Sequence, residues 1–173
     1  EIVHGIPGDR KMREGDIVSI DFGAIVDGFH GDSAFTMGVG EISEKANLLI
    51  KTTKDSLDEG IKKAISGARL TNISHAVQKY AEGKGFSVVR EYVGHGIGRA
   101  LHEEPQVPNY GKAGLGPRLR AGMALAIEPM LNAGTWRTKG LGDGWTIVTA
   151  DGELSAHFEH TIAITENGPE ILT

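Results

Sequence analysis

The pattern that most constrains the fold lies in residues 16–37, which read DIVSIDFGAIVDGFHGDSAFTM. Apolar residues alternate with polar or small ones on both sides of Asp27-Gly28. This dipeptide readily adopts the positive φ angles that a two-residue type I′ turn requires. The pattern therefore predicts a β-hairpin in which Val26 lies opposite Phe29.

This register places two acidic side chains on the same face of the hairpin. Gly23 pairs with Asp32, and Asp21, two residues before Gly23, lies on the same face. Asp21 and Asp32 are then diagonal neighbours with backbones about 7–8 Å apart. The opposite face is apolar, and we expect it to face the core; it carries Val18, Ile20, Phe22, Ala24, Val26, Phe29 and Phe35.

The two aspartates alone do not define a site. Like charges at this separation repel each other unless a proton or a cation lies between them. For an isolated pair of strand aspartates, exposure to water at the rim of a sheet is the simpler interpretation. A functional interpretation therefore needs partners from elsewhere in the chain.

Length and composition narrow the class of protein. A chain of 173 residues suits one domain. The net charge of −5 disfavours a specific nucleic-acid partner. Without cysteine there is neither a disulfide framework nor a thiolate metal site. We find no apolar run of transmembrane length and no signal peptide, so we expect no membrane partner. The absence of cysteine fits a cytoplasmic protein.

The remaining pattern mixes helices and strands in an α+β arrangement. It predicts helices at about 43–66 and from Thr71, as N-cap, to 83, and strands at 87–92 and 122–128. Residues 103–122 and 132–143 are expected to be connections. A second hairpin, with strands 145–149 and 154–165 around Asp151-Gly152, repeats the first in outline and suggests two related halves.

Four further residues, each at a strand end or beside a glycine turn, are candidates to join the aspartates: His95, His102, Glu128 and Glu159. Each alone has an ordinary explanation, because a histidine beside glycine is typical of a turn and a glutamate at a strand end is typically solvated. Together, two aspartates, two glutamates and one histidine form an oxygen-rich set that suits a pair of divalent cations.

Six motifs resemble those of the bacterial type of methionine aminopeptidase, in the order of that family and over nearly the whole chain. They are HGIPG at 4–8, SIDFG at 19–23, HGDSA at 30–34, GHGIGRALHEEP at 94–105, IEPM at 127–130 and FEHTI at 158–162. The resemblance implies the pita-bread fold, an antiparallel sheet backed by helices in two pseudo-symmetric halves. It also implies a single metallopeptidase catalytic domain over residues 1–173.

The resemblance assigns the site residue by residue. It implies two divalent metal ions, from among cobalt, manganese, iron and zinc, with the ligands Asp21, Asp32, His95, Glu128 and Glu159. Asp32 and Glu159 would bridge the ions, and Glu128 would also shuttle a proton. It implies catalytic roles for His4, which contacts the scissile amide, and His102, which donates to the scissile carbonyl oxygen. His4, Leu101, His102 and Trp145 would contact the substrate, although Trp145 also suits the core of a hairpin.

The implied activity is hydrolysis of the N-terminal methionine from nascent proteins and peptides with a small second residue, by a hydroxide that the two ions activate. The partners would be such N-termini, and an association with the ribosome is compatible with this activity. Two departures stand out. Leu101 replaces an aromatic residue of many bacterial members, and the N-terminal helix and strand segment of full-length relatives is missing. We therefore expect a truncated domain; the full-length family is monomeric, whereas exposed sheet edges would favour pairing with another chain.

Two alternatives remain open. Xaa-Pro aminopeptidases and prolidases share a similar ligand set, but FEHTI and IEPM favour the methionine-specific branch. A non-catalytic binding module, or a metal-binding scaffold made inactive by truncation, belongs to another class. The presence of all five ligand positions argues against a module that has lost its site.

Overall fold

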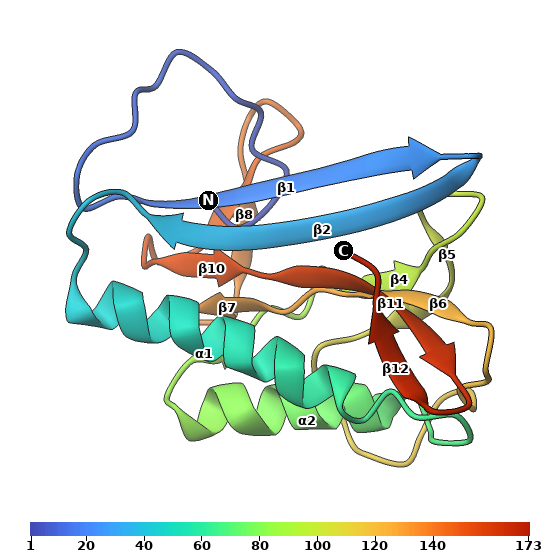
Figure 1. The fold of residues 1–173 in the computed structure, drawn as a ribbon. Helices are drawn as coiled ribbons and strands as arrows, with labels where there is room; N and C mark the ends of the chain where they lie inside the picture. Colours follow the sequence, from blue (N-terminus) through green and yellow to red (C-terminus); the bar gives the residue numbers. More distant parts are fainter.

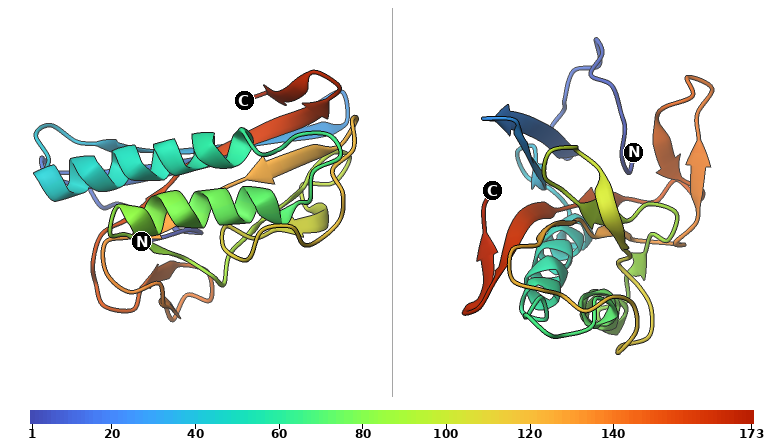
Figure 2. Two further views of the ribbon diagram at one scale, coloured as in Figure 1. Left: turned by 90° about the horizontal axis from the view of Figure 1, so that it is seen from below. Right: turned by 90° about the vertical axis from the view of Figure 1, so that its right-hand side faces the viewer.

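A long β-hairpin and a pair of helices dominate the fold of residues 1–173, all of which the computed structural model describes (Figure 1). The hairpin consists of β1 (Ile17–Val26) and β2 (Phe29–Gly38), and the helices are α1 (Glu44–Ile61) and α2 (Thr71–Gly83). The helices lie side by side on the side of the molecule away from the hairpin (Figure 2). This arrangement confirms the predicted α+β class.

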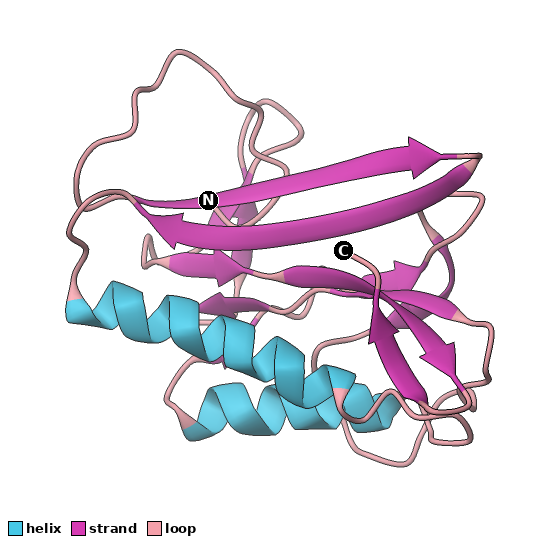
Figure 3. Ribbon diagram, in the orientation of Figure 1, coloured by secondary structure: helices cyan, strands magenta, loops and turns pink.

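The main sheet has seven strands in the order β1-β2-β11-β6-β4-β5, with β12 paired to β11. All of its pairs are antiparallel (Figure 3). Its further strands are β4 (Gly94–Gly96), β5 (Glu103–Val107), β6 (Ala124–Ile127), β11 (Glu159–Thr165) and β12 (Gly168–Ile171). Two smaller sheets contain β10 (Ser155–His157), β7 (Met130–Asn132) and β3 (Ser87–Val88), and β8 (Thr138–Gly140) with β9 (Ile147–Thr149).

The predicted register of the first hairpin is confirmed. Val26 pairs with Phe29, and Gly23 pairs with Asp32. The turn residues Asp27 and Gly28 have φ angles of 51° and 79°, as a type I′ turn requires. Local sequence therefore suffices to build this element.

The expectation that the apolar face of this hairpin faces the core is wrong. Phe22 is 54% exposed and Val26 is 69% exposed, and Ile20, Phe29 and Phe35 are exposed as well. The reason lies in the layering, because α1 packs against β10, β7, β6 and β2, and the residues of β2 that are buried, Ala34 and Thr36, lie on the other face of the hairpin. Strand β1 lies at the edge of the sheet, and no helix among the 173 residues covers it.

The core lies between the helices and the centre of the sheet. One cluster of buried residues joins Leu57 and Ile73 of the helices to Leu125, Ile127 and Ile162 of the strands. Burying a side chain of this size contributes about 1.5–3 kcal/mol. The helices approach closely at one glycine, since a Cβ at position 60 would lie 2.7 Å from the side chain of Val77.

The helix boundaries differ from the prediction in two places. Helix α1 ends at Ile61, because the chain beyond it leaves the helix to pair with another loop: Gly67 donates to the Leu119 carbonyl, and Leu119 donates to that of Ala68. Thr71 is the first residue of α2 and not its N-cap. Neither helix is long and apolar enough to cross a membrane.

The second predicted hairpin does not form. Strand β9 pairs with β8, whereas β10 pairs with β7, so the Asp151-Gly152 turn connects two different sheets. The Asp151 carboxylate accepts the backbone N–H groups of Thr135 and Glu153, which ties this turn to the loop before β8. The supposed connections contain β5 and β8, and β12 was not predicted. These pairings join distant segments, which a local alternation pattern does not report.

Candidate metal centre and active site

Five acidic and imidazole side chains come from five neighbouring strands of the main sheet, four of them within a strand and one directly after it. The sheet order β1-β2-β11-β6-β4 brings them together although they span most of the chain. In strand order they are Asp21, Asp32, Glu159, Glu128, which directly follows β6, and His95. All five predicted ligand positions therefore lie on adjoining strands.

Three of these side chains already surround one point. One donor atom each from Asp32, His95 and Glu159 lies within 4.8 Å of the others. The Nε2 atom of His95 is 4.0 Å from Asp32 Oδ2 and 3.4 Å from Glu128 Oε1. These separations exceed those of hydrogen bonds and match ligand atoms arranged around a common cation.

Two glycines let the backbone on either side of His95 lie close to the neighbouring strands. A Cβ on Gly94 would collide with the carbonyl oxygen of Ala126, and one on Gly96 with that of Glu104. The Nδ1 atom of His95 lies 2.9 Å from the Gly96 carbonyl oxygen, so Nδ1 carries the hydrogen and Nε2 offers its lone pair to the cluster. Burial lowers the pKa of His95, which favours this neutral form.

The clustered carboxyl groups cannot all ionise without strong mutual repulsion, so their pKa values are raised. Burial, and then repulsion from Glu128 and the two aspartates, raises the pKa of Glu159 to about 10. Burial also raises the pKa of Glu128 well above its usual value, and that of Asp21 above its own. The Oε1 atom of Glu159 is buried without a hydrogen-bond partner. Because this oxygen-rich set has one imidazole and no thiolate, the donors fit hard or borderline divalent cations.

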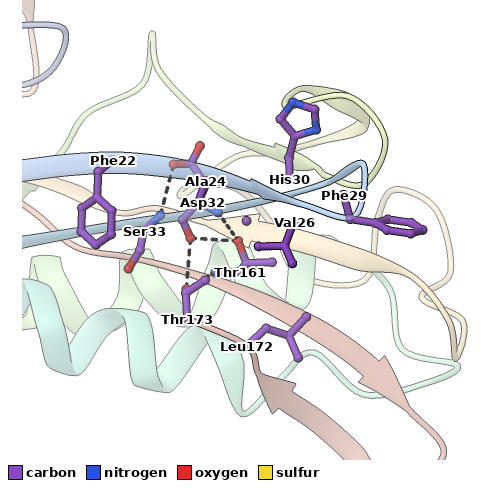
Figure 4. A pocket seen from close by; sticks show the side chains of 11 residues that line it. Phe22, Ala24, Val26, Phe29, His30, Asp32, Ser33, Thr161, Leu172 and Thr173 are labelled. Atoms are coloured by element: carbon purple, nitrogen blue, oxygen red, sulfur yellow. Dashed lines mark hydrogen bonds between the residues drawn. The ribbon is translucent and has the colours of Figure 1, made fainter.

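Hydrogen bonds hold the backbone of these residues. The Thr161 hydroxyl accepts from the Asp32 N–H and donates to the Asp32 carbonyl, both at 2.8 Å (Figure 4). The Asn109 amide donates to the Glu128 carbonyl oxygen at 3.0 Å. On the hairpin side of Asp32 lies a mostly apolar cavity of about 480 Å³. Of the cluster residues only Asp32 lines this cavity, whereas His95, Glu128 and Glu159 do not.

The predicted substrate residues lie around this cluster in two groups. The exposed His102 ring stands edge-on to His95, with centroids 4.4 Å apart. His4, which has a φ of 61°, packs edge-on against Tyr92 at 5.5 Å and Trp145 at 5.9 Å. Trp145 is 60% exposed, so its interpretation as a hairpin core residue is wrong.

Leu101 lies on the acidic face of the hairpin. Its Cδ1 atom would be 3.7 Å from a Cβ built on Gly23, and the same Cβ would be 3.5 Å from Asp32 Oδ1. The glycine therefore leaves space between Leu101 and the acids. Sequence reasoning did not assign a role to Tyr92, Asn109 or His157, which also touch the site.

His157 is the most informative of these omissions. It is only 1% exposed, and its Nε2 atom lies 3.9 Å from Glu128 Oε2. Burial lowers its pKa to about 4. The available signal was the spacing: residues 157 and 159 are two apart in a predicted strand, so alternation puts them on the same face.

Comparison with known proteins identifies the family. The sequence matches Metallopeptidase family M24 over residues 1–166. The methionine aminopeptidase of Clostridium perfringens and methionine aminopeptidase 1 of Bacillus subtilis are each 60% identical over 173 residues. The chain belongs to the methionine aminopeptidases of family M24. The alignments cover all of this chain and 70% of each relative.

Solved structures agree with this assignment. The methionine aminopeptidase of Thermotoga maritima superimposes with a TM-score of 0.97 at 53% identity, over 99% of this chain and 69% of that one. A prolidase from Thermococcus sibiricus gives a TM-score of 0.76 at 25% identity, over 98% of this chain and 41% of that one. The predicted pita-bread fold and family resemblance are confirmed, and the prolidase alternative is not favoured.

Proposed function

We propose that this methionine aminopeptidase removes the N-terminal methionine from peptides and nascent proteins with a small second residue, by metal-dependent hydrolysis. The observation that carries the proposal is the convergence of Asp32, His95 and Glu159 on one point. It occurs in a chain that is 60% identical over its whole length to methionine aminopeptidases.

The proposed cofactor is a pair of divalent ions, drawn from manganese, cobalt, iron and zinc. The ligands would be Asp21, Asp32, His95, Glu128 and Glu159. The orphaned Glu159 oxygen and the raised carboxyl pKa values support this set. When bound, such ions lower the pKa of water and polarise the scissile carbonyl group.

The chain's own groups have separate tasks. His102, exposed beside His95, would donate to the oxygen that becomes negative as the peptide carbonyl is attacked. Glu128 would accept a proton and pass it to the leaving amine, a task suited to a carboxyl whose pKa is raised. His4 would orient the scissile amide. Trp145 and Leu101 would contact the methionine side chain.

The wider assignments follow from this substrate. New polypeptide N-termini are made in the cytoplasm, which supports placing the protein there and leaves an association with ribosomes as a prediction. We treat residues 1–173 as one catalytic domain, because the main sheet joins β1 near the start of the chain to β12 near its end. Whether the protein is a monomer or pairs with another chain through exposed sheet edges stays a prediction.

The test begins with protein stripped of metal by a chelator. It is titrated with Mn²⁺ or Co²⁺ and assayed on the peptides Met-Ala-Ser and Ala-Pro-Ala. We expect metal uptake and cleavage of the first peptide alone. Cleavage of only the proline peptide would support the prolidase alternative. Absence of metal uptake would support a non-catalytic binding module, and metal uptake without cleavage of either peptide would support a metal-binding but inactive scaffold.

A matched pair of variants tests the site itself. Asp32→Asn keeps the size of the side chain and removes its charge, and we expect it to abolish both metal uptake and cleavage. Asp27→Asn makes the same change in the turn of the same hairpin, where asparagine tolerates the positive φ angle. If the two variants take up metal and cleave the peptide equally well, Asp32 is not part of the metal site.

A further inference from the structure

His157 is held rigidly, yet its ring has no partner. Its backbone N–H donates to the Thr36 hydroxyl at 2.8 Å, and that hydroxyl donates to the His157 carbonyl at 2.9 Å. In the pairing of β10 with β7 it stands opposite Met130, two residues after Glu128. Both ring nitrogens are buried without a hydrogen-bond partner. Unpartnered buried polar groups are rare and call for an explanation.

The ring is directed at the free side of a proposed ligand. His157 Nε2 lies 3.9 Å from Glu128 Oε2, while the other oxygen, Oε1, lies 3.4 Å from His95 Nε2. The Glu128 carboxylate therefore stands between two imidazoles. One of them belongs to the proposed ligand set and the other does not.

The geometry argues against His157 as a further ligand. His157 Nε2 lies beside Oε2 of Glu128, whereas the oxygen that faces the His95 lone pair and the cluster is Oε1. A separation of 3.9 Å from Oε2 would need to shorten by about 1 Å to give an ordinary N–H···O hydrogen bond. The hydrogen bond therefore requires the Glu128 carboxylate to move towards the ring.

We propose that His157 positions Glu128 for metal binding: its Nε2–H donates to Glu128 Oε2 and leaves Oε1 directed at the cation beside His95. This inference rests on the proposed function. A hydrogen bond of this kind orients a metal ligand, and its loss typically weakens metal affinity by about 10–100-fold. His157 is a positioning residue here, because it acts through Glu128.

Two amide substitutions separate this role from simple packing. Counted along the side chain from Cα, the Nε2 atom of glutamine matches Nε2 of histidine, whereas the amide nitrogen of asparagine matches only Nδ1. His157→Gln therefore keeps a donor facing Glu128, and His157→Asn does not. His157→Leu removes the donor and keeps the volume filled.

The measurement is the affinity for Mn²⁺ or Co²⁺, by isothermal titration calorimetry on metal-stripped protein, with the visible spectrum of bound Co²⁺ as a second readout. We expect His157→Gln to bind within about threefold of the parent, and His157→Asn and His157→Leu to bind about 10–100-fold more weakly. His160→Gln serves as control. His160 follows Glu159 in β11, so its side chain lies on the face of that strand opposite to Glu159, and the change should leave the metal affinity and the Co²⁺ spectrum unchanged.

Several results would overturn the inference. Parental affinity in both His157→Asn and His157→Leu would show that the hydrogen bond does not matter. A raised KM for Met-Ala-Ser with unchanged metal affinity would make His157 a substrate contact. Equal weakening in His157→Gln would mean that the imidazole itself binds the metal. If His157→Leu fails to fold in a thermal melt, the Gln and Asn pair decides.

The proposed function fails separately from this inference. If the parent protein takes up no metal, or cleaves no Met-Ala-Ser, the proposed function is wrong before any variant is compared. If the parent binds and cleaves while the His157 variants behave like it, only the positioning role is wrong.

Discussion

Replacing Glu159 with glutamine should stabilise the metal-free protein at neutral and alkaline pH. Glu159 is almost completely buried, and its Oε1 atom has no hydrogen-bond partner. Burial and the neighbouring carboxylates raise its pKa to about 10, against an ordinary value of 4.5. In the folded, metal-free protein it therefore keeps its proton at neutral pH, whereas in the unfolded chain it loses it.

The sign and size follow from this difference in bound protons. Between the unfolded pKa of 4.5 and the folded pKa of about 10, the folded state binds one more proton. The stabilisation that the folded state gains by holding this proton on Glu159 is fully present below pH 4.5. It is lost progressively as the pH rises towards 10. Each pH unit costs up to about 1.4 kcal/mol, so the free energy of unfolding should fall by about 3 kcal/mol from pH 6 to pH 8. Glutamine stays neutral throughout and removes this part of the slope.

The assay is urea unfolding in the presence of a chelator, followed by tryptophan fluorescence at pH 6, 7 and 8. Glu159→Gln should lose less stability than the parent over this range, and Glu170→Gln, on the exposed strand β12, should follow the parent. Added Mn²⁺ at pH 8 should stabilise the parent and not Glu159→Gln. A parent curve that is flat with pH, or an equal slope in Glu159→Gln, would refute the account of the buried carboxylates.

Three further changes have expected outcomes. His102→Ala should lower kcat by about 10²–10³-fold, as for loss of one oxyanion donor, with metal content near that of the parent; a collapse of metal content would contradict this role. Trp145→Ala should raise KM for Met-Ala-Ser about tenfold, the equivalent of roughly 1.4 kcal/mol of lost contact, with little change in kcat; an unchanged KM would remove Trp145 from the substrate pocket. Phe22→Ser, on the exposed face of the hairpin, should change the free energy of urea unfolding by less than about 0.5 kcal/mol, whereas Leu125→Ala in the core should cost about 2–5 kcal/mol. Similar costs for these two variants would mean that the hairpin face is covered in solution.

The sequence by itself determined the first hairpin and the candidate ligands. Asp27-Gly28 requires only local backbone preferences to form its turn, and strand alternation then puts Asp21 and Asp32 on one face. The order of the six motifs was enough to predict the family and the pita-bread fold, which the comparisons confirm. The ligand set stays a prediction, although the structure brings Asp32, His95 and Glu159 together.

Only the tertiary structure decided which surfaces are buried and which strands pair. Alternation shows that the face of Phe22 is apolar, but burial depends on whether a helix packs there, and α1 packs elsewhere. The same limit explains the failed second hairpin, because β9 and β10 find partners far along the chain. It also explains why His157 was overlooked, since its position beside Glu128 arises from the pairing of β10 with β7. Local preferences act over a few residues, whereas packing depends on which distant segments the folded chain brings together.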